Sequence, residues 1–267
     1  MPKIDYHFHT AYSYDSLTEL KEVFGRAIEA GLDMLCVTDH DTMEGALQLK
    51  ELEASRLRII VGCEFTTDDH SHVIGLNLRR MIKEKNIFML MEAIKKQGGL
   101  VMLPHIFRRG NGIFRNEMKR SEEFIQQTLL YTDAVECFNG RDTWENNRRS
   151  YEFVMQNNLP AVAGSDAHSP EEIGSVYVAY PESDFVHGQS ARHIFFPFQK
   201  PRAENPLKRK LMEYYHLHKE HLPGFVQHSY QQMKRILKKD SISNKNLAPQ
   251  FQYEFPAVLQ KINTHEK

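Results

Sequence analysis

The opening segment of the chain carries histidines and carboxylates at a spacing suited to metal binding. It reads Asp-Tyr-His-Phe-His-Thr-Ala-Tyr-Ser-Tyr-Asp from Asp5 to Asp15. Side chains of a β-strand alternate between its two faces, so a strand here would place Asp5, His7 and His9 on one face. Two neutral imidazoles that converge, with a carboxylate as a ligand or as an orienting partner, form half of a transition-metal site. An edge strand with solvated histidines is the competing interpretation of a lone His-x-His.

Further candidate ligands stand at the C-terminal ends of short apolar runs. The side chains that end these runs are His40, Glu64, His105, Asn139, Asp166 and His168. A carboxylate such as Glu64 at the end of a buried strand is costly unless it is paired or binds a metal. Asp166 and His168 repeat the spacing of His7 and His9. Each group alone has an ordinary structural explanation, but their recurrence at equivalent positions favours a metal site.

Strand and helix alternate in the elements that must position these groups. After the opening strand, apolar runs predict strands at 34–40, 58–64, 72–78, 100–105, 134–139 and 161–168, and helical patterns predict helices near 16–31, 42–54, 86–97, 117–130 and 143–157. The first helix is expected to begin in the capping box Ser16-Leu-Thr-Glu19 and to end at Gly31.

Such alternation with short connections is typical of βα units and a parallel sheet. The strands read as continuous apolar runs, which is typical of strands buried on both faces. In (β/α) barrels the active site is built at the C-terminal ends of several strands. An open doubly wound sheet uses the same edge, but no Gly-rich nucleotide loop follows the first strand here. We therefore favour a barrel.

The composition is that of an ordinary globular chain. The 267 residues are 41% hydrophobic and 26% charged, which is sufficient for a full core. The chain opens without a charged leader and an apolar run, and the sequence has no apolar run of membrane length, so we expect a cytoplasmic protein. Cys36, Cys63 and Cys137 lie in apolar runs and form no Cys-x-x-Cys pair. They are expected to be reduced, buried thiols.

Net charge separates the C-terminal part of the chain from the rest. Residues 1–185 contain 20 Lys and Arg against 29 Asp and Glu, a net charge of −9, whereas residues 200–239 contain 10 against 3, a net charge of +7. We expect a catalytic barrel over 1–185 and a basic, mainly helical extension with a polar tail over 186–267. The two expected helices of the extension, near 206–221 and 225–239, would cover the barrel or contact a polyanion.

The ordered motifs resemble the PHP family, the polymerase and histidinol phosphatase domain. They are His7-Phe-His9, Ser13-Tyr-Asp15, Thr38-Asp-His40, Gly62-Cys-Glu64, Pro104-His105 and Ser165-Asp-Ala-His168, within a resemblance that spans about residues 3–180. The resemblance implies a distorted (β/α)7 TIM-like barrel, here with the C-terminal helical extension. It also implies two or three divalent metal ions and the hydrolysis of phosphoesters.

The same resemblance implies ligands for each ion. It assigns His7, His9, Glu64 and Asp166 to the first ion, Asp15, His40 and His168 to the second, and Glu64 and His105 to a third. The third site usually takes one more ligand, for which Cys137 is expected because thiolates suit zinc, with Glu136 on the opposite face as the alternative. His70 and His72 are left out, since similar proteins carry a histidine at the second position that is not usually a ligand.

The expected activity is therefore that of a metal-dependent phosphoesterase with zinc, manganese or iron. Asp166 or His168 would protonate the leaving oxygen, and Arg108, Arg109 and Arg141, on loops that follow strands, would bind phosphate. The substrate is either a small phosphorylated molecule or a short oligonucleotide. Two alternatives stay open: an oligonucleotide-directed nuclease, and a non-catalytic domain that metal ions stabilise.

Overall fold

A single curved sheet organises the computed structural model, which describes residues 2–53, 56–180 and 193–195. The strands follow the order β7-β6-β5-β4-β3-β2-β1-β8-β9 across the sheet. They are β1 (Lys3–Phe8), β2 (Met34–Val37), β3 (Arg58–Thr66), β4 (His72–Leu76), β5 (Leu100–Leu103), β6 (Ala134–Asn139), β7 (Ala161–Gly164), β8 (Tyr177–Ala179) and β9 (His193–Phe195). Each strand predicted from the sequence is present.

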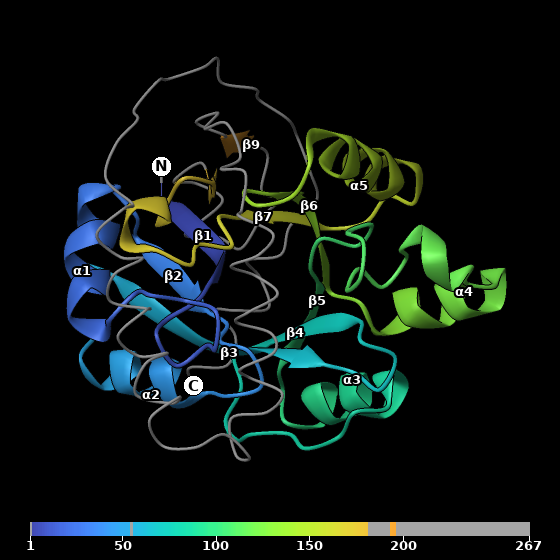
Figure 1. Cartoon of the computed structure of the whole chain (residues 1–267), viewed down its shortest axis with the longest axis horizontal. Coiled ribbons are helices and arrows are strands. Elements are labelled where there is room, and N and C mark those ends of the chain that lie inside the picture. Colours follow the sequence, from blue (N-terminus) through green and yellow to red (C-terminus); the bar gives the residue numbers. More distant parts are fainter. Residues whose placement is uncertain (1, 54–55, 181–192, 196–267) are drawn as a thin grey trace, which may run out of the picture.

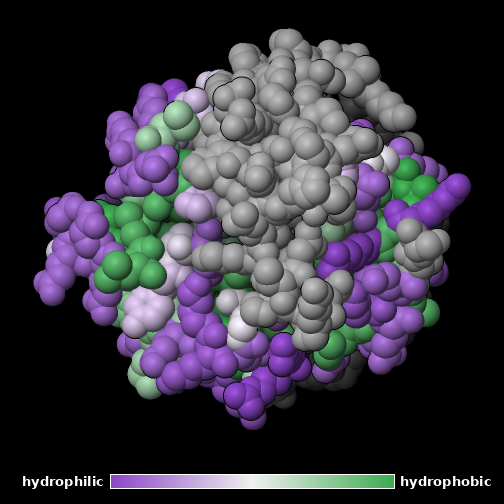
Figure 2. All heavy atoms as spheres, turned by 180° about the vertical axis from the view of Figure 1, so that it is seen from behind, coloured by the Kyte–Doolittle hydropathy of each residue, from purple (hydrophilic) through white to green (hydrophobic). Residues whose placement is uncertain are grey.

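Five α-helices of the described residues lie on the outside of this sheet. They are α1 (Leu20–Glu29), α2 (Glu44–Glu51), α3 (Ile87–Lys96), α4 (Glu122–Tyr131) and α5 (Trp144–Gln156), with short 3-10 turns at Asn116–Met118 and Pro170–Glu172. In Figure 1, α1 and α2 stand on one side of the molecule, and α3, α4 and α5 on the other. Figure 2 shows hydrophilic side chains over much of the described surface, with smaller hydrophobic groups between them.

The barrel closes where the segment after β7 meets the end of β1. The backbone N–H of His9 donates to the carbonyl of Ala167 at 3.0 Å, and that of Asp166 donates to the carbonyl of His7 at 2.7 Å. Near the beginning of β1, the antiparallel strand β8 takes the same edge, with Ile4 opposite Val178. The seam, where the barrel closes, is therefore made by β1 with two partners, the segment after β7 and the strand β8. The expected distorted TIM-like barrel is confirmed.

The expectation of an all-parallel series is wrong at β4. This strand runs antiparallel to both β3 and β5. The connection between β3 and β4 is only residues 67–71, whereas a parallel crossover needs a dozen or more. The hairpin places His72, the first residue of β4, opposite Thr66 near the end of β3. His72 therefore lies at the end of the barrel where the candidate ligands gather.

Two helices begin later than the sequence predicts. The first follows Glu19, and the hydroxyl of Ser16 donates instead to the carbonyl of His9 at 2.8 Å, so the proposed capping box does not form. The fourth helix begins after Ser121, whose hydroxyl accepts the N–H of Phe124. Gly31 does end the first helix, with a φ of +71° that favours glycine.

Further expectations from the sequence concern the cysteines, membrane-spanning helices and the C-terminal part of the chain. All three cysteines are buried and free, as expected. Within the described residues, we find no helix that is long and apolar enough to cross a membrane. The boundary near residue 185 and the predicted helices near 206–221 and 225–239 lie outside the described residues.

We predict that Gly164→Ala destabilises the barrel. A Cβ at Gly164 would lie 2.4 Å from Cβ and 2.7 Å from the backbone nitrogen of His7, atoms that cannot move without shifting β1. Urea unfolding should show a loss of about 2 kcal/mol or more. Gly25→Ala in α1 is the matched control: its Cβ meets no described atom within 4 Å, so a gain of about 0.5–1 kcal/mol is expected. Equal effects of the two substitutions would contradict this account of the seam.

Candidate metal centre

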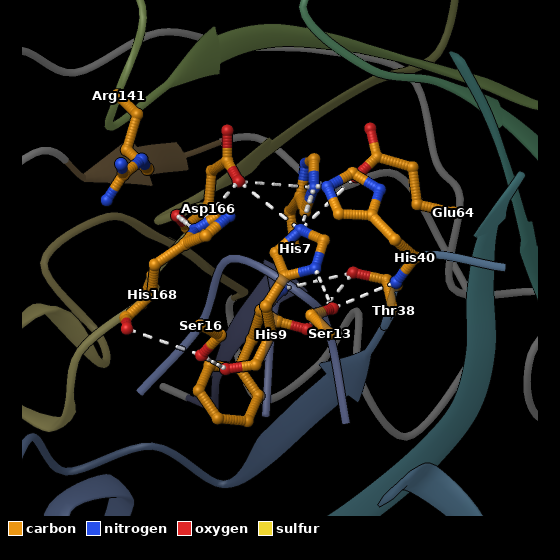
Figure 3. Close-up of polar contacts among 12 residues, drawn as sticks. His7, His9, Ser13, Ser16, Thr38, His40, Glu64, Arg141, Asp166 and His168 are labelled. Carbon is orange, nitrogen blue, oxygen red and sulfur yellow. Dashed lines mark hydrogen bonds and ion pairs between the residues drawn. The ribbon is translucent and has the colours of Figure 1, made fainter. Parts of the chain in front are cut away.

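Side chains from the ends of successive strands converge at one end of the barrel (Figure 3). They are His7, His9, Asp15, His40, Glu64, His72, His105, Glu136, Asp166 and His168. All are buried except Asp15, whose side chain is 24% exposed. Sequence positions more than 150 residues apart are thus brought together, because the first and last strands of the barrel meet at the seam.

Two imidazole nitrogens form the middle of this cluster. Nε2 of His7 lies 3.0 Å from Nε2 of His9. Oε2 of Glu64 lies 3.2 Å from each of them, and Oδ1 of Asp166 lies 3.5 Å from the first and 3.3 Å from the second. Two nitrogens and two carboxylate oxygens therefore face one point.

The outer nitrogens of His7 and His168 are held by oxygens that only accept hydrogen bonds. Nδ1 of His7 lies 3.1 Å from Oε1 of Glu136, and Nδ1 of His168 lies 2.7 Å from the carbonyl oxygen of Asp166. Because such oxygens need a donor, each ring carries its proton on Nδ1. In the neutral ring of His7, Nε2 then presents a lone pair to the cluster, whereas Nε2 of His168 faces a second acceptor, Oδ2 of Asp15, at 2.9 Å.

Ser13 fixes the imidazole of His9 in the same way. Its hydroxyl donates to Oδ1 of Asp39 at 3.1 Å and accepts the N–H of His40 at 2.9 Å. The remaining lone pair faces Nδ1 of His9 at 2.9 Å, so that nitrogen is the donor. In the neutral rings of His9 and His7, each Nε2 is therefore an acceptor.

This arrangement fits a bound cation. Two nitrogen lone pairs 3.0 Å apart repel each other unless a positive charge lies between them. Two donors that share one metal ion at bonds of about 2.0–2.2 Å lie about 3–3.5 Å apart, which matches the central distances. The mixture of imidazole and carboxylate donors suits zinc, iron and manganese.

A second group of donors surrounds Asp15. Its Oδ2 lies 2.9 Å from Nε2 of His168 and 3.4 Å from Nε2 of His40. The other oxygen, Oδ1, is buried and has no hydrogen-bond partner among the described residues. A buried carboxylate oxygen without a partner is costly, so this group also fits a cation.

Charge in the cluster is set by burial and by opposite charges. Burial raises the pKa of Asp166, but His7 and Arg108 outweigh it and hold that pKa well below its ordinary value. Burial lowers the pKa of His7, but the carboxylates of Asp166, Glu136 and Glu64 outweigh it and raise that pKa well above its ordinary value. The cluster therefore favours the protonated form of His7, and protons compete with metal ions for its Nε2.

Asp5 orients backbone and does not join the donor cluster. Its Oδ1 accepts the N–H groups of His7 at 3.2 Å and Ser165 at 2.9 Å, and its Oδ2 accepts that of Gly174 at 3.3 Å. Burial raises the pKa of this carboxyl to about 6 despite these hydrogen bonds. Asp5 thus ties β1 to the loop that carries Asp166.

Two residues of the cluster have backbone in the left-handed region. His105 has a φ of +27° and Asp166 a φ of +52°. The N–H of His105 is held by Oε2 of Glu136 at 2.8 Å, and the N–H of Asp166 by the carbonyl of His7 at 2.7 Å. Such backbone persists only where neighbours fix it, and it is concentrated at functional sites.

Of the neighbouring residues Glu136 and Cys137, it is Glu136 that faces the donor cluster. Cys137 lies in the hydrophobic core and belongs to no donor group of the described residues, while burial raises the pKa of its thiol. Glu136 faces the cluster, where it contacts the ring of His7 and the backbone of His105. Strand alternation predicted opposite faces for this pair, but not which side chain would point inward.

The three arginines expected at the site lie in different places. Arg108 donates to Oδ2 of Asp166 at 2.9 Å and to Oδ1 of Asn139 at 2.6 Å. Arg141 pairs with Glu172 at 3.1 Å, at the edge of the group drawn in Figure 3. The side chain of Arg109 is 93% exposed and pairs with Glu117. The side chain of Arg108 thus contacts a residue of the donor cluster directly.

Sequence reasoning passed over His72. Its Nδ1 lies 2.8 Å from Oε1 of Glu64, and the same oxygen lies 2.9 Å from Nε2 of His105. The signal that could have found it is the short connection 67–71, which forces a hairpin and returns the chain to the same end of the barrel.

We predict that Ser13→Ala weakens zinc binding by about 10–100-fold, because His9 loses the partner that fixes its tautomer. Isothermal titration of chelator-stripped protein measures the affinity. Ser121→Ala, which removes the cap of α4 far along the chain, should leave zinc affinity unchanged. Equal zinc affinity in Ser13→Ala and the unsubstituted protein would contradict the assigned tautomer.

Comparison with known proteins places the chain in a family. The PHP domain model matches residues 5–166. An uncharacterized protein of Methanocaldococcus jannaschii is 33% identical over 115 residues, which are 39% of this chain and 67% of that protein.

Two solved structures share the fold at lower identity. A two-domain protein of Bacteroides vulgatus, which contains a predicted PHP-like metal-dependent phosphoesterase, is 20% identical with a TM-score of 0.52 over 79% of this chain and 62% of its own. Endonuclease Q, in complex with a 27-mer duplex substrate that has an abasic lesion at the active site, is 14% identical with a TM-score of 0.51 over 78% and 55%. Because the family model matches more than half of its residues, the chain belongs to the PHP domain family.

Proposed function

We propose that this protein is a metal-dependent phosphoesterase that hydrolyses phosphate esters at the cluster described above. The observation that carries the proposal is the convergence of the Nε2 atoms of His7 and His9 with oxygens of Glu64 and Asp166. Membership of the PHP family supports it. So does the likeness in fold to a predicted metal-dependent phosphoesterase and to an endonuclease.

The proposed ligands form two groups, and one residue of the first group also faces a third position. The first ion is held by His7, His9, Glu64 and Asp166, and the second ion is held by Asp15, His40 and His168. Together with His105, Glu64 also faces a further position. Cys137 is left out because it lies in the hydrophobic core. When bound, divalent zinc, manganese or iron supplies Lewis acidity and an activated water.

The substrate approaches from the side of Asp15 and Arg108. These side chains are 24% and 18% exposed, whereas those of His7 and His9 are fully buried. Arg108 uses one N–H for Asp166 and one for Asn139. A guanidinium has five N–H donors, so others stay available for a phosphate oxygen. Arg141, near the edge, is the second phosphate-binding candidate.

Asp166 and His168 are the two candidates for protonating the leaving oxygen. Asp166 is held as a carboxylate, because Oδ2 accepts from Arg108 and Oδ1 faces His7 and His9. His168 keeps Nε2 beside Asp15, at the more open side of the cluster. We therefore assign a ligand role to Asp166, and His168 is the candidate for the proton transfer in the state in which its Nε2 is not bound to the second ion.

The substitution His9→Ala tests this proposal. It should abolish the hydrolysis of phosphoesters while the far-UV circular dichroism spectrum is retained, because the ring faces other polar side chains and its loss opens no apolar cavity. Arg148→Ala on the exposed face of α5 is the control and should keep full activity. Retention of more than about a tenth of kcat in His9→Ala, an effect below about 1.4 kcal/mol, would contradict the proposal.

Chelation separates an enzyme from a non-catalytic, metal-stabilised domain. Treatment with EDTA should abolish hydrolysis, and one of zinc, manganese or iron should restore it. If phosphometabolites and short oligonucleotides are all inert under every metal, and EDTA only lowers the melting temperature, the protein is a metal-stabilised binding domain. Hydrolysis restricted to oligonucleotides would instead establish the nuclease alternative.

A further inference from the structure

A run of positive side chains lies between β4 and α3, apart from the donor cluster. Residues 79–85, which we call the basic ridge, read Arg-Arg-Met-Ile-Lys-Glu-Lys. They contain four cations and one carboxylate, a net charge of +3, whereas residues 1–185 as a whole have a net charge of −9. The basic ridge therefore reverses the sign of charge locally on an acidic body.

The backbone of the basic ridge is fixed at its start, in its middle and at its end. The N–H groups of Arg79 and Arg80 donate to Oε1 of Gln97, the C-cap of α3, at 2.8 and 3.0 Å. Ile82 is 9% exposed and belongs to the hydrophobic core. Directly after the ridge, Asn86 caps the N-terminus of α3. The ridge therefore runs along the whole length of α3, which is about 15 Å for a helix of 10 residues.

The described residues do not neutralise the positive charge of the basic ridge. Elsewhere on the described surface, exposed cations often lie beside carboxylates, as Lys96 does at 2.8 Å from Glu92 in α3. Glu84, the acid within the ridge, turns Oε1 to the backbone N–H groups of Lys85 at 3.0 Å and Asn86 at 3.1 Å. The cationic side chains of the ridge are exposed and form no ion pair with a described residue; they are Arg79, Arg80, Lys83 and Lys85.

One end of the basic ridge lies toward the end of the barrel that holds the donor cluster. The carbonyl of Lys85 accepts the N–H of Asp68 at 3.0 Å. Asp68 belongs to the connection 67–71 between β3 and β4, which leads into His72. A long anion bound along the ridge would therefore have one end on the side of the proposed catalytic site.

We propose that the basic ridge binds the phosphate backbone of a nucleic acid. Phosphates recur about every 3.4 Å along one strand of a duplex, so a length of about 15 Å presents several of them to the four cations. Contacts with phosphates carry no sequence information, so binding is expected to be independent of sequence. The inference goes beyond the proposed phosphoesterase activity and does not require it.

An anionic membrane surface is the competing partner for such a segment. Segments that bind membranes combine cations with apolar side chains that enter the lipid. In the basic ridge, Ile82 packs into the core and Met81 is 40% exposed. One partly exposed methionine offers little area for insertion, so the ridge fits a row of phosphates better than a bilayer.

Two variants of the 267-residue chain, each with four cations replaced by glutamine, test the proposal. The ridge variant leaves the backbone hydrogen bonds of the segment in place and combines Arg79→Gln, Arg80→Gln, Lys83→Gln and Lys85→Gln. The control variant makes the same change in net charge at paired cations of α1, α2 and α5, and combines Lys21→Gln, Arg26→Gln, Lys50→Gln and Arg148→Gln. Circular dichroism and the melting temperature check that each variant is folded. A double variant, Lys83→Gln with Lys85→Gln, repeats the test with half the change in charge.

Fluorescence anisotropy measures the binding of a labelled DNA duplex of about 20 base pairs between about 50 and 200 mM NaCl. Its phosphorothioate linkages resist hydrolysis. We expect the control variant to bind as the unsubstituted protein does, and the ridge variant to bind about tenfold or more weakly at the lower salt concentration. The slope of log affinity against log salt should fall by about 2 or more in the ridge variant, because each phosphate contact contributes about 0.9.

Equal affinity and slope in the ridge and control variants would contradict the proposal, and this result would follow if the basic extension alone bound the duplex. Failure of the unsubstituted protein to bind the duplex would contradict it as well. Co-sedimentation with vesicles of phosphatidylserine and phosphatidylcholine tests the competing partner. If the ridge variant loses vesicle binding but binds the duplex as the control variant does, the ridge is a membrane contact and the proposal is wrong.

These outcomes are separate from catalysis, because the probe is not hydrolysed. A protein that binds the duplex through the basic ridge but hydrolyses no phosphoester would contradict the proposed function and leave the ridge proposal intact. A phosphoesterase whose duplex binding is the same in the ridge and control variants would do the reverse.

Discussion

The enforced approach of electron-rich atoms at one end of the barrel is the constraint on which the rest of this structure depends. Nε2 of His7 and Nε2 of His9 are 3.0 Å apart, with oxygens of Glu64 and Asp166 beside them. In a buried site such a grouping is stable only with positive charge between its members. Protons can supply that charge, and so can divalent metals, which explains why family membership and local geometry lead to the same conclusion.

The surrounding structure keeps these atoms from turning away. Ser13, Glu136 and the carbonyl of Asp166 hold the outer nitrogens of three imidazoles. Asp39 in turn fixes Ser13, and Asn139 donates to Glu136 at 2.9 Å. Partners of this kind set the tautomer and orientation of a ligand and are therefore part of the site. Their side chains come from strand ends that the barrel seam brings together, so the fold determines the donor geometry.

The strand series and most of the donor cluster could be predicted from the sequence, because apolar runs with polar ends are a local signal. The direction of β4 could not be predicted in the same way. A run of apolar residues does not encode its pairing, and only the short connection 67–71 indicates a hairpin. His72 was passed over for that reason. The inward choice of Glu136 over Cys137 depends on the register of β6 against its neighbours, which alternation alone leaves open. The start of α1 was misplaced because Ser16 satisfies a carbonyl of the seam, a contact made only in the folded chain.

The central claim is that the cluster holds divalent ions at two separate groups of donors. Anomalous diffraction from crystals grown with manganese tests this most directly, since it locates each ion without reference to activity. The account predicts one peak among His7, His9, Glu64 and Asp166, and another among Asp15, His40 and His168. A crystal saturated with manganese that shows no peak, or a single peak, at these two groups would contradict it.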